Sequence, residues 1–210
     1  MKSRREFLQM GLAALSLPIA AGAPAAAGPP LQANELAPKG PAPAPVQFYK
    51  VVFDARFADC VSFAEEAGRL GATIHGIRGD MTDLWYYDLD ARWKKSPAAI
   101  AGLTAHGPLF CLEQLAWNHR MRVIFRAEHK YLADGSVEHS FSGPESMVQQ
   151  ASNLGQDRHD WPSRIADMIA SCPSTRAKMA QAKVTTASRK SAQKNGETLF
   201  SWVIAPVSRT

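Results

Sequence analysis

The stretch that decides the fold runs from residue 46 to residue 80 and reads VQFYKVVFD (46–54), ARFADCVSFAEEAGRL (55–70) and GATIHGIRGD (71–80). The first part is a continuous β-branched and aromatic run that ends at Asp54, which is typical of a buried strand. The middle part places five apolar residues on one helical face: Phe57, Cys60, Val61, Ala64 and Ala67. The last part supplies a second short strand. Strand, helix and strand in this order predict a βαβ unit with parallel strands and a right-handed crossover.

A β-hairpin is predicted further along the chain, where MRVIFRAEHKYL (121–132) and SVEHSFSG (136–143) flank a turn. A two-residue turn at 134–135 would place the apolar faces of the two strands on opposite sides of the sheet. A three-residue turn, 133–135 with Gly135 in the left-handed conformation, keeps them on one side. It pairs Tyr131 with Val137, His129 with His139, Ala127 with Phe141 and Lys130 with Glu138. We therefore prefer the three-residue turn.

The remaining segments complete a single α/β domain over residues 46–210. Residues 81–97 are interpreted as a loop with a helical turn or two, and GLTAHGP (102–108) as a loop leading into a buried helix at 106–120. A helix at 160–172 should begin at Asp160 as N-cap, with Ile165, Met168 and Ile169 facing inward. A strand at 198–206 closes the domain. The expected architecture is a partly parallel sheet of about five strands with flanking helices and an antiparallel hairpin at one edge.

The amino terminus contains two adjacent arginines, Arg4 and Arg5, followed by Phe7, Leu8 and a small-residue apolar run. This arrangement resembles the twin-arginine (Tat) signal peptide, with cleavage expected after Ala27. The resemblance covers residues 1–27 only, and it implies contact with the Tat translocase and export of the folded protein to the periplasm or beyond. Residues 28–45 are rich in proline and alanine and are predicted to form a disordered tether. No transmembrane segment is expected in the mature protein.

Charge and cysteine content exclude several classes of function. Removing the predicted signal peptide lowers the net charge only from +5 to +3, because the peptide contains Lys2, Arg4, Arg5 and Glu6. No C-x-x-C or G-x-G-x-x-G motif is present, so the sequence lacks haem, iron–sulfur and dinucleotide signatures. Three cysteines allow at most one disulfide. Nucleic acid is not an expected partner, because basic and aromatic residues are not interleaved and because the expected location of the exported protein, the periplasm or beyond, is not where nucleic acid is bound.

A basic segment at residues 173–196 contains six cations and no acidic residue. It is either a surface attracted to anionic lipid or an acidic partner, or a solvated helix or loop. The second interpretation is preferred. The position of this segment between the last helix and the closing strand favours neither interpretation.

The first candidate site lies at the carboxyl ends of the predicted strands, where open α/β sheets bind ligands. Asp54 and Asp80 end the two strands of the βαβ unit. The loop before the buried helix adds Thr104 and His106, which together with backbone N–H groups would bind an anion. The alternative is that these are ordinary turn residues.

The hairpin register supplies a second candidate, because it places the Cβ atoms of His129 and His139 roughly 5 Å apart. Such a pair would bind zinc or copper if a third ligand were near, and His75, Asp80 and His119 are the possibilities. Otherwise the pair is a structural, neutral one.

Two residues of the predicted helix at 106–120 are weaker candidates for a catalytic role. Cys111 is expected to be a core residue rather than a nucleophile. Glu113 is either a buried acid–base group or part of an exposed stripe.

Two classes of function follow. The first is a non-catalytic exported protein, either an accessory or escort subunit of a redox enzyme or a small-ligand binder. The aromatic stretch LWYYDLDARW (84–93), with Trp85, Tyr86, Tyr87 and Trp93, would suit a partner interface. The alternative, that these aromatic residues cap the sheet, is slightly preferred. The second class is a metal-assisted or anion-binding hydrolase that uses the candidate residues above.

Overall fold

The computed structural model describes residues 44–154, 160–174, 177–187 and 198–207. The predicted signal peptide, and most of the predicted tether, lie outside these residues. The end of the tether, however, belongs to the domain: the Ser174 N–H donates to the Ala44 carbonyl (3.0 Å) and the Val46 N–H to the Cys172 carbonyl (2.7 Å). The boundary therefore lies slightly before the predicted residue 46.

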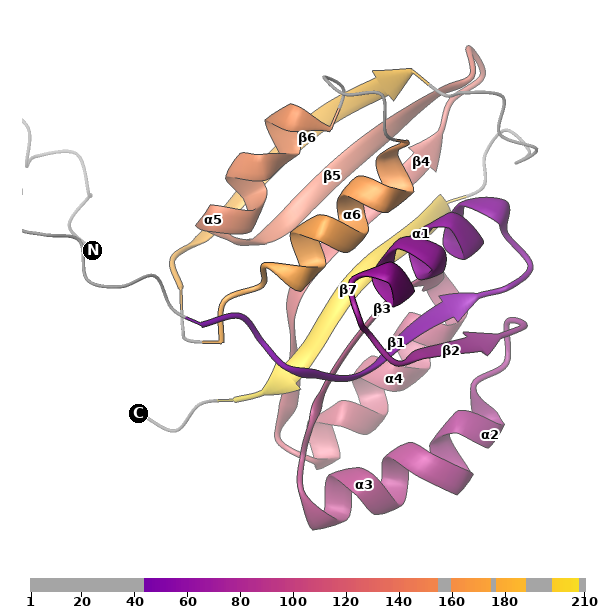
Figure 1. Cartoon of the computed structure of the whole chain (residues 1–210), viewed down its shortest axis with the longest axis vertical. Coiled ribbons are helices and arrows are strands. Elements are labelled where there is room, and N and C mark those ends of the chain that lie inside the picture. Colours follow the sequence, from indigo (N-terminus) through magenta and orange to yellow (C-terminus); the bar gives the residue numbers. More distant parts are fainter. Residues whose placement is uncertain (1–43, 155–159, 175–176, 188–197, 208–210) are drawn as a thin grey trace, which may run out of the picture. The chain divides into compact units, whose positions relative to one another are not determined.

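One mixed sheet of seven strands forms the centre of the domain (Figure 1). The strands are β1 (Phe48–Asp54), β2 (Ile74–Ile77), β3 (Ala99–Ala105), β4 (Met121–Tyr131), β5 (Ser136–Pro144), β6 (Met179–Ala187) and β7 (Thr198–Pro206). Their order is β2-β1-β3-β7-β4-β5-β6. β1 is parallel to both β2 and β3, and all other neighbours are antiparallel. The α/β class and the parallel βαβ unit are confirmed, with seven strands instead of about five.

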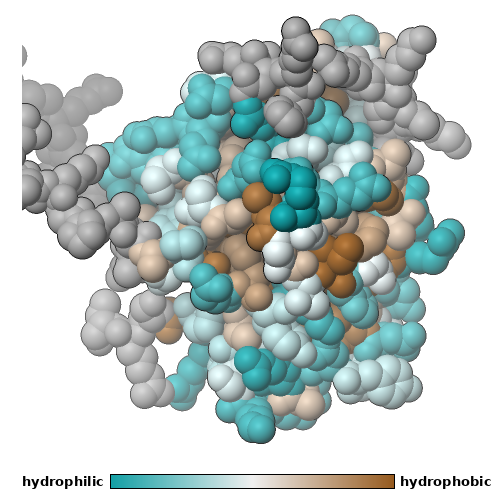
Figure 2. Space-filling view, viewed as in Figure 1, coloured by the Kyte–Doolittle hydropathy of each residue, from teal (hydrophilic) through white to brown (hydrophobic). Residues whose placement is uncertain are grey.

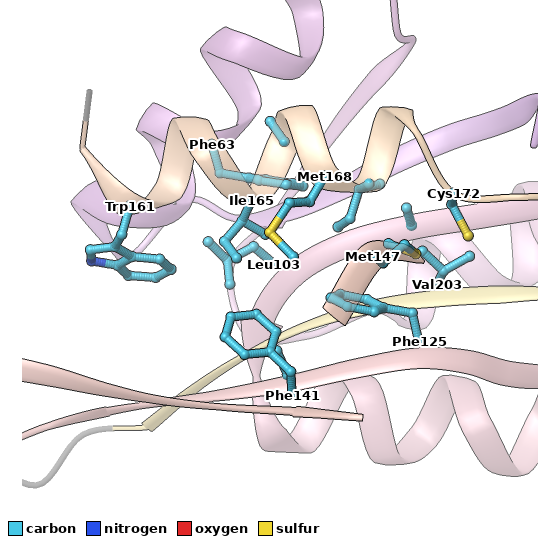
Figure 3. Close-up of a cluster of buried hydrophobic side chains, with 14 of the residues drawn as sticks. Phe63, Leu103, Phe125, Phe141, Met147, Trp161, Ile165, Met168, Cys172 and Val203 are labelled. Carbon is cyan, nitrogen blue, oxygen red and sulfur yellow. The ribbon is translucent and has the colours of Figure 1, made fainter. Parts of the chain in front are cut away.

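Helices cover both faces of the sheet. They are α1 (Ala58–Arg69), α2 (Thr82–Leu84), the π-helix η1 (Trp85–Leu89), α3 (Asp90–Lys95), α4 (His106–Asn118), α5 (Glu145–Val148), the 3-10 helix η2 (Gln149–Asn153) and α6 (Trp161–Ala170). α1, α5 and α6 pack on what we call the first face, and α2, α3 and α4 on the second face. On the first face, side chains of α6 and Phe63 of α1 point toward Leu103, Phe125, Phe141 and Val203 of the sheet (Figure 3).

An apolar groove of about 190 Å³ opens between α1 and α6 beside the start of β1. Figure 2 shows hydrophobic residues at the surface near the middle of the molecule, surrounded by hydrophilic residues. Leu70, at the end of α1, is the most exposed large apolar side chain of the groove.

The hairpin register is confirmed. β4 pairs with β5 so that His129 lies opposite His139 and Lys130 opposite Glu138, and Gly135 has φ +83°. The hairpin is not at the edge of the sheet, because β6 pairs with the outer side of β5. The helix at 160–172 is also confirmed as α6, with the Asp160 carboxylate accepting from the Ser163 N–H (3.4 Å).

Two strands were missed by the sequence analysis. β3 occupies residues predicted as the loop GLTAHGP, and it contains Gly102 because a side chain there would overlap the Val52 carbonyl oxygen of β1 and the Trp202 ring of β7. β6 occupies part of the segment predicted as a solvated helix or loop. Alternate β6 side chains are exposed, so backbone pairing with β5 places it rather than burial. Residues 175–176 and 188–196 of that segment lie outside the described residues.

Two helix predictions also need correction. Residues 82–95 form a continuous helical segment rather than a loop with a turn or two, and the π-helix within it shifts the side-chain period and hides the usual pattern. α4 is buried on one side only: Phe110 and Trp117 are each 51% exposed. None of the helices in the described part of the chain has the length and apolarity that a bilayer crossing needs.

Candidate functional site

The carboxyl ends of β1 and β3 form a topological switch point. These strands are parallel neighbours, with Phe53 paired to Leu103. From β1 the chain turns to α1 on the first face, whereas from β3 it turns to α4 on the second face. Connections that leave neighbouring strands toward opposite faces open a crevice at the sheet edge, and ligands bind there in open α/β sheets. The predicted ligand residues Asp54, Thr104 and His106 all lie at this edge.

Asp54 ends β1 and is completely buried. Its carboxylate accepts two hydrogen bonds from the Arg56 guanidinium, from Nε at 2.9 Å and from Nη2 at 2.6 Å, and a third from the Arg56 backbone N–H at 3.3 Å. The side chain of Arg56 is 44% exposed and lies against Gly79, whose φ of +83° and lack of Cβ leave room for the guanidinium. Asp54 is thus an anchor for Arg56: it balances the charge of the guanidinium and holds this partly exposed group of donors at the edge.

Thr104 and His106 lie at the end of β3 with different surroundings. Thr104 is fully buried, accepts from Trp202 Nε1 (3.2 Å) and donates to the Ala105 carbonyl (2.9 Å), so its hydroxyl is used within the fold. His106 is the exposed first residue of α4, with its ring 5.3 Å from the ring of Phe200. Ala105 stands at the N-cap and offers no side-chain acceptor to the first turn. The space in front of Gly107 is open.

Asp80 follows β2 and is the next residue after Gly79, against which Arg56 lies. Its carboxylate accepts from the backbone N–H (2.8 Å) and the hydroxyl (2.6 Å) of Thr82. The hydroxyl bond is the main reason why the pKa of Asp80 is below its ordinary value. Asp80 therefore stabilises the start of the helical segment at Thr82, and its carboxylate is used within the fold.

His129 and His139 form a buried pair beneath Trp161, at the start of α6. Their Nδ1 atoms are 2.7 Å apart. His129 Nε2 lies 2.9 Å from the hydroxyl of Ser201, and His139 Nε2 lies 2.8 Å from that of Thr186. One hydrogen-bonded chain therefore crosses β7, β4, β5 and β6, and every ring nitrogen has a partner.

Burial lowers the pKa values of both histidines, to about 4 for His139, and the neighbouring ring lowers that of His129 further. Both rings are therefore neutral at pH 7, with one proton between the two Nδ1 atoms. The proposed third ligands lie elsewhere: His119 contacts Trp85 and Trp93 on the second face, and His75 is on β2. Among the described residues no group of three or more metal-ligating side chains occurs. We assign the pair a hydrogen-bonding role.

This pair predicts an acid-sensitive stability. The histidines protonate near pH 6.5 in the unfolded chain but only at much lower pH in the folded one, so below pH 6.5 the unfolded state binds more protons. The free energy of unfolding should therefore fall by up to about 2.7 kcal/mol per pH unit between pH 6.5 and about 4. Urea unfolding at several pH values measures this slope. The variant H129L/H139L should lose most of it, and an unchanged slope in that variant would contradict the assignment.

A cluster that the sequence analysis missed lies where β1 meets η1. The pairing of β1 with β3 shifts between Phe48 and Lys50, so a β-bulge directs both Tyr49 and Lys50 toward the second face. Tyr49 Oη donates to Asp88 Oδ1 (2.6 Å), and Lys50 Nζ pairs with Asp88 Oδ2. Asp88 belongs to the π-helix. Two backbone irregularities thus meet at one carboxylate.

Electrostatics explain why this cluster is stable. Burial by itself raises the pKa of Asp88, but hydrogen bonds from Lys50 and Tyr49 outweigh it, and the pKa is lowered. The bond to Asp88 raises the pKa of Tyr49, and burial lowers that of the neighbouring His75. An isolated lysine in the strand VQFYKVVFD was the signal for this cluster, because a charge within a buried strand requires a partner.

The aromatic stretch at 84–93 divides into buried and exposed residues. Trp93 is buried, and its ring centroid lies 5.9 Å from that of the half-buried Trp85. Tyr86 and Tyr87 are 69% and 85% exposed. Only these two fit the predicted interface.

Cys111 and Glu113 lie on the outer side of α4. Cys111 is exposed rather than in the core, which corrects the prediction, and all three cysteines are free thiols. The carboxylate of Glu113 is 3.7 Å from the guanidinium of Arg126. Both side chains are partly solvent-accessible. This places Glu113 in a surface ion pair.

Comparisons with protein-family models, with curated proteins and with solved structures find no match to this chain.

Proposed function

We propose that the chain is exported in the folded state by the twin-arginine route and binds a small anion without catalysing a reaction. The switch point between β1 and β3 is the observation that carries the proposal, because it places the hydrogen-bond donors of Arg56 and His106 at the carboxyl ends of two neighbouring parallel strands. Arg56 is held in place from the β1 side by the buried Asp54. His106 stands exposed on the β3 side.

The start of α4 supports the same ligand chemistry. Without a side-chain cap, its first-turn N–H groups lack an acceptor from the N-cap residue, and the helix dipole favours negative charge there. Open space beside Gly107 lets a ligand approach the backbone. A compact oxyanion such as phosphate, sulfate or a small carboxylate fits these donors.

Thermal unfolding in the presence of phosphate, sulfate, acetate and citrate tests the proposal. An anion at about 100 times its Kd should raise Tm by roughly 8 °C relative to chloride at equal ionic strength. H106A should reduce this rise at the same ligand concentration. Q114A, on an exposed position of the same helix, should leave it unchanged. If none of the four anions exceeds chloride, or if H106A responds like the unaltered chain, the site is wrong.

The exposed pair Tyr86 and Tyr87 favours a second candidate function, that of an accessory or escort subunit. Tyrosines are frequent energetic anchors of protein interfaces. The π-helix holds both of them outward while Leu89 is buried. The partner would be a second protein exported in complex with this chain.

Comparison of exported proteins in three strains tests this second function. R4K/R5K should abolish export of the chain together with any partner that lacks its own signal. Y86S/Y87S should leave the chain itself exported but lose the partner. Retention of every other exported protein in both variants would argue against an escort.

A further inference from the structure

A patch at the end of α4 combines exposed apolar and basic side chains. Trp117 lies in the last turn of α4 and is 51% exposed. Val207 follows β7, is 52% exposed, and donates its N–H to the Arg120 carbonyl (3.0 Å). α3, α4 and β7 end at the same corner in Figure 1. The turn from α4 to β4 is thus flanked by two exposed apolar side chains.

Three cations belong to the same corner, and with Trp117 and Val207 they make up what we call the Trp117 patch. The Arg122 guanidinium lies 5.9 Å from the Trp117 ring centroid, and Arg120 is exposed in the turn. The third cation is Lys95, the last residue of α3. Within the described residues, no carboxylate lies within ion-pair distance of these three side chains.

Lys95 ends α3, which reaches the same corner as the end of α4 in Figure 1, and a contact of Asp90 links the two helices. The Asp90 carboxylate accepts from Lys94 Nζ (2.7 Å) and lies 3.9 Å from His119 Nε2. Asp90 is the first residue of α3 and His119 is the C-cap residue of α4, so this contact joins the start of α3 to the end of α4. That carboxylate is already shared by Lys94 and His119, so the patch keeps a net positive charge.

We propose that the Trp117 patch binds the surface of an anionic lipid bilayer. Cations at helix C-termini interact favourably with the helix dipole, which accounts for Lys95 and Arg120 but not for an exposed indole beside an exposed valine. Indole rings are enriched at membrane interfaces because one part is apolar and the N–H is polar. Lysine and arginine near such a surface are attracted by anionic headgroups.

The basic segment at 173–196, which suggested lipid binding in the sequence, is a different surface. Its described cations on or next to β6 each have a carboxylate partner: Lys183 Nζ lies 2.9 Å from Glu138 and Lys178 Nζ 3.4 Å from Glu145. These pairs reduce the positive charge of that surface. The Trp117 patch has no such compensation among the described residues.

Co-sedimentation of the full chain with lipid vesicles tests the proposal. The probes are vesicles of phosphatidylcholine alone and vesicles containing about 30% phosphatidylglycerol, an anionic lipid. Each cation near the anionic surface should contribute roughly fivefold to the partition coefficient, so R120Q/R122Q should lower it about 25-fold at low salt. W117A should lower it as well, and its Tm is measured alongside to show that the variant is folded. The N-terminal segment is the same in all variants, so the differences report on the patch.

The matched control is K130Q/K183Q, which removes two cations from the sheet surface. It should bind the anionic vesicles as the unaltered chain does. Equal losses in both double variants would mean charge attraction without a site, and the proposal would be overturned. Unchanged binding in R120Q/R122Q and W117A, or equal binding to the two kinds of vesicle, would overturn it too.

Discussion

Replacing Gly102 with alanine is expected to lower the free energy of unfolding by about 3 kcal/mol or more. An added Cβ would overlap the carbonyl oxygen of Val52 in β1 and lie 2.6 Å from Trp202 Cζ2. The oxygen belongs to the backbone of the neighbouring parallel strand and cannot rotate away. Urea unfolding measures the loss, and Tm should fall by roughly 10 °C.

Two further variants distinguish the steric overlap of the added Cβ at position 102 from a general effect of replacing glycine with alanine. G107A, at a helical position with nothing within 4 Å, should be neutral or slightly stabilising. Shrinking the ring in G102A/W202F should not restore stability, because the clash with Val52 remains. Full rescue by W202F would show that the ring alone, and not the β1 backbone, requires glycine.

Replacing His139 with leucine is expected to cost about 3 kcal/mol at pH 7, the second large effect. Leucine leaves Nδ1 of the completely buried His129, and the hydroxyl of Thr186, without the partners they have now. A buried polar atom that loses its hydrogen bond costs more than the bond itself contributes. Urea unfolding at pH 7 gives the value.

A double-mutant cycle tests whether the two rings act as a unit. H129L and H139L together should cost about 1–2 kcal/mol less than the sum of the single variants, because the double variant leaves no imidazole unpaired. Additive costs would mean that the Nδ1 contact contributes nothing to stability, and the structural role assigned to the pair would fail.

Local patterns were enough to predict the parts of the fold in which burial and backbone preference agree. The apolar run at 46–54, the apolar face at 57–67 and the N-cap at Asp160 each report the environment of their own segment. The hairpin register also followed, since only one turn length keeps the apolar faces of both strands together. From that register came the histidine pair.

The missed elements are those placed by residues far away in the chain. β3 is predicted poorly because Gly102 reflects the ring of Trp202, which is distant in the sequence. β6 has few buried side chains, and its partner β5 supplies its hydrogen bonds. The cluster around Asp88 depends on a bulge in β1 facing a π-helix, and no periodicity reports either irregularity.

For the candidate sites, too, one part could be predicted from local patterns and the other part depends on residues far away in the chain. By itself the sequence determined that Asp54 ends the first strand and that His129 faces His139, because the burial pattern of each segment sets its strand limits and its hairpin register. Only the tertiary structure decided their roles. It pairs Asp54 with Arg56, uses Thr104 to hold Trp202, turns Asp80 toward Thr82 and leaves His106 exposed. The physical reason is that a side chain's chemistry depends on its burial and its partners, and these come from segments that the chain brings together only when it folds.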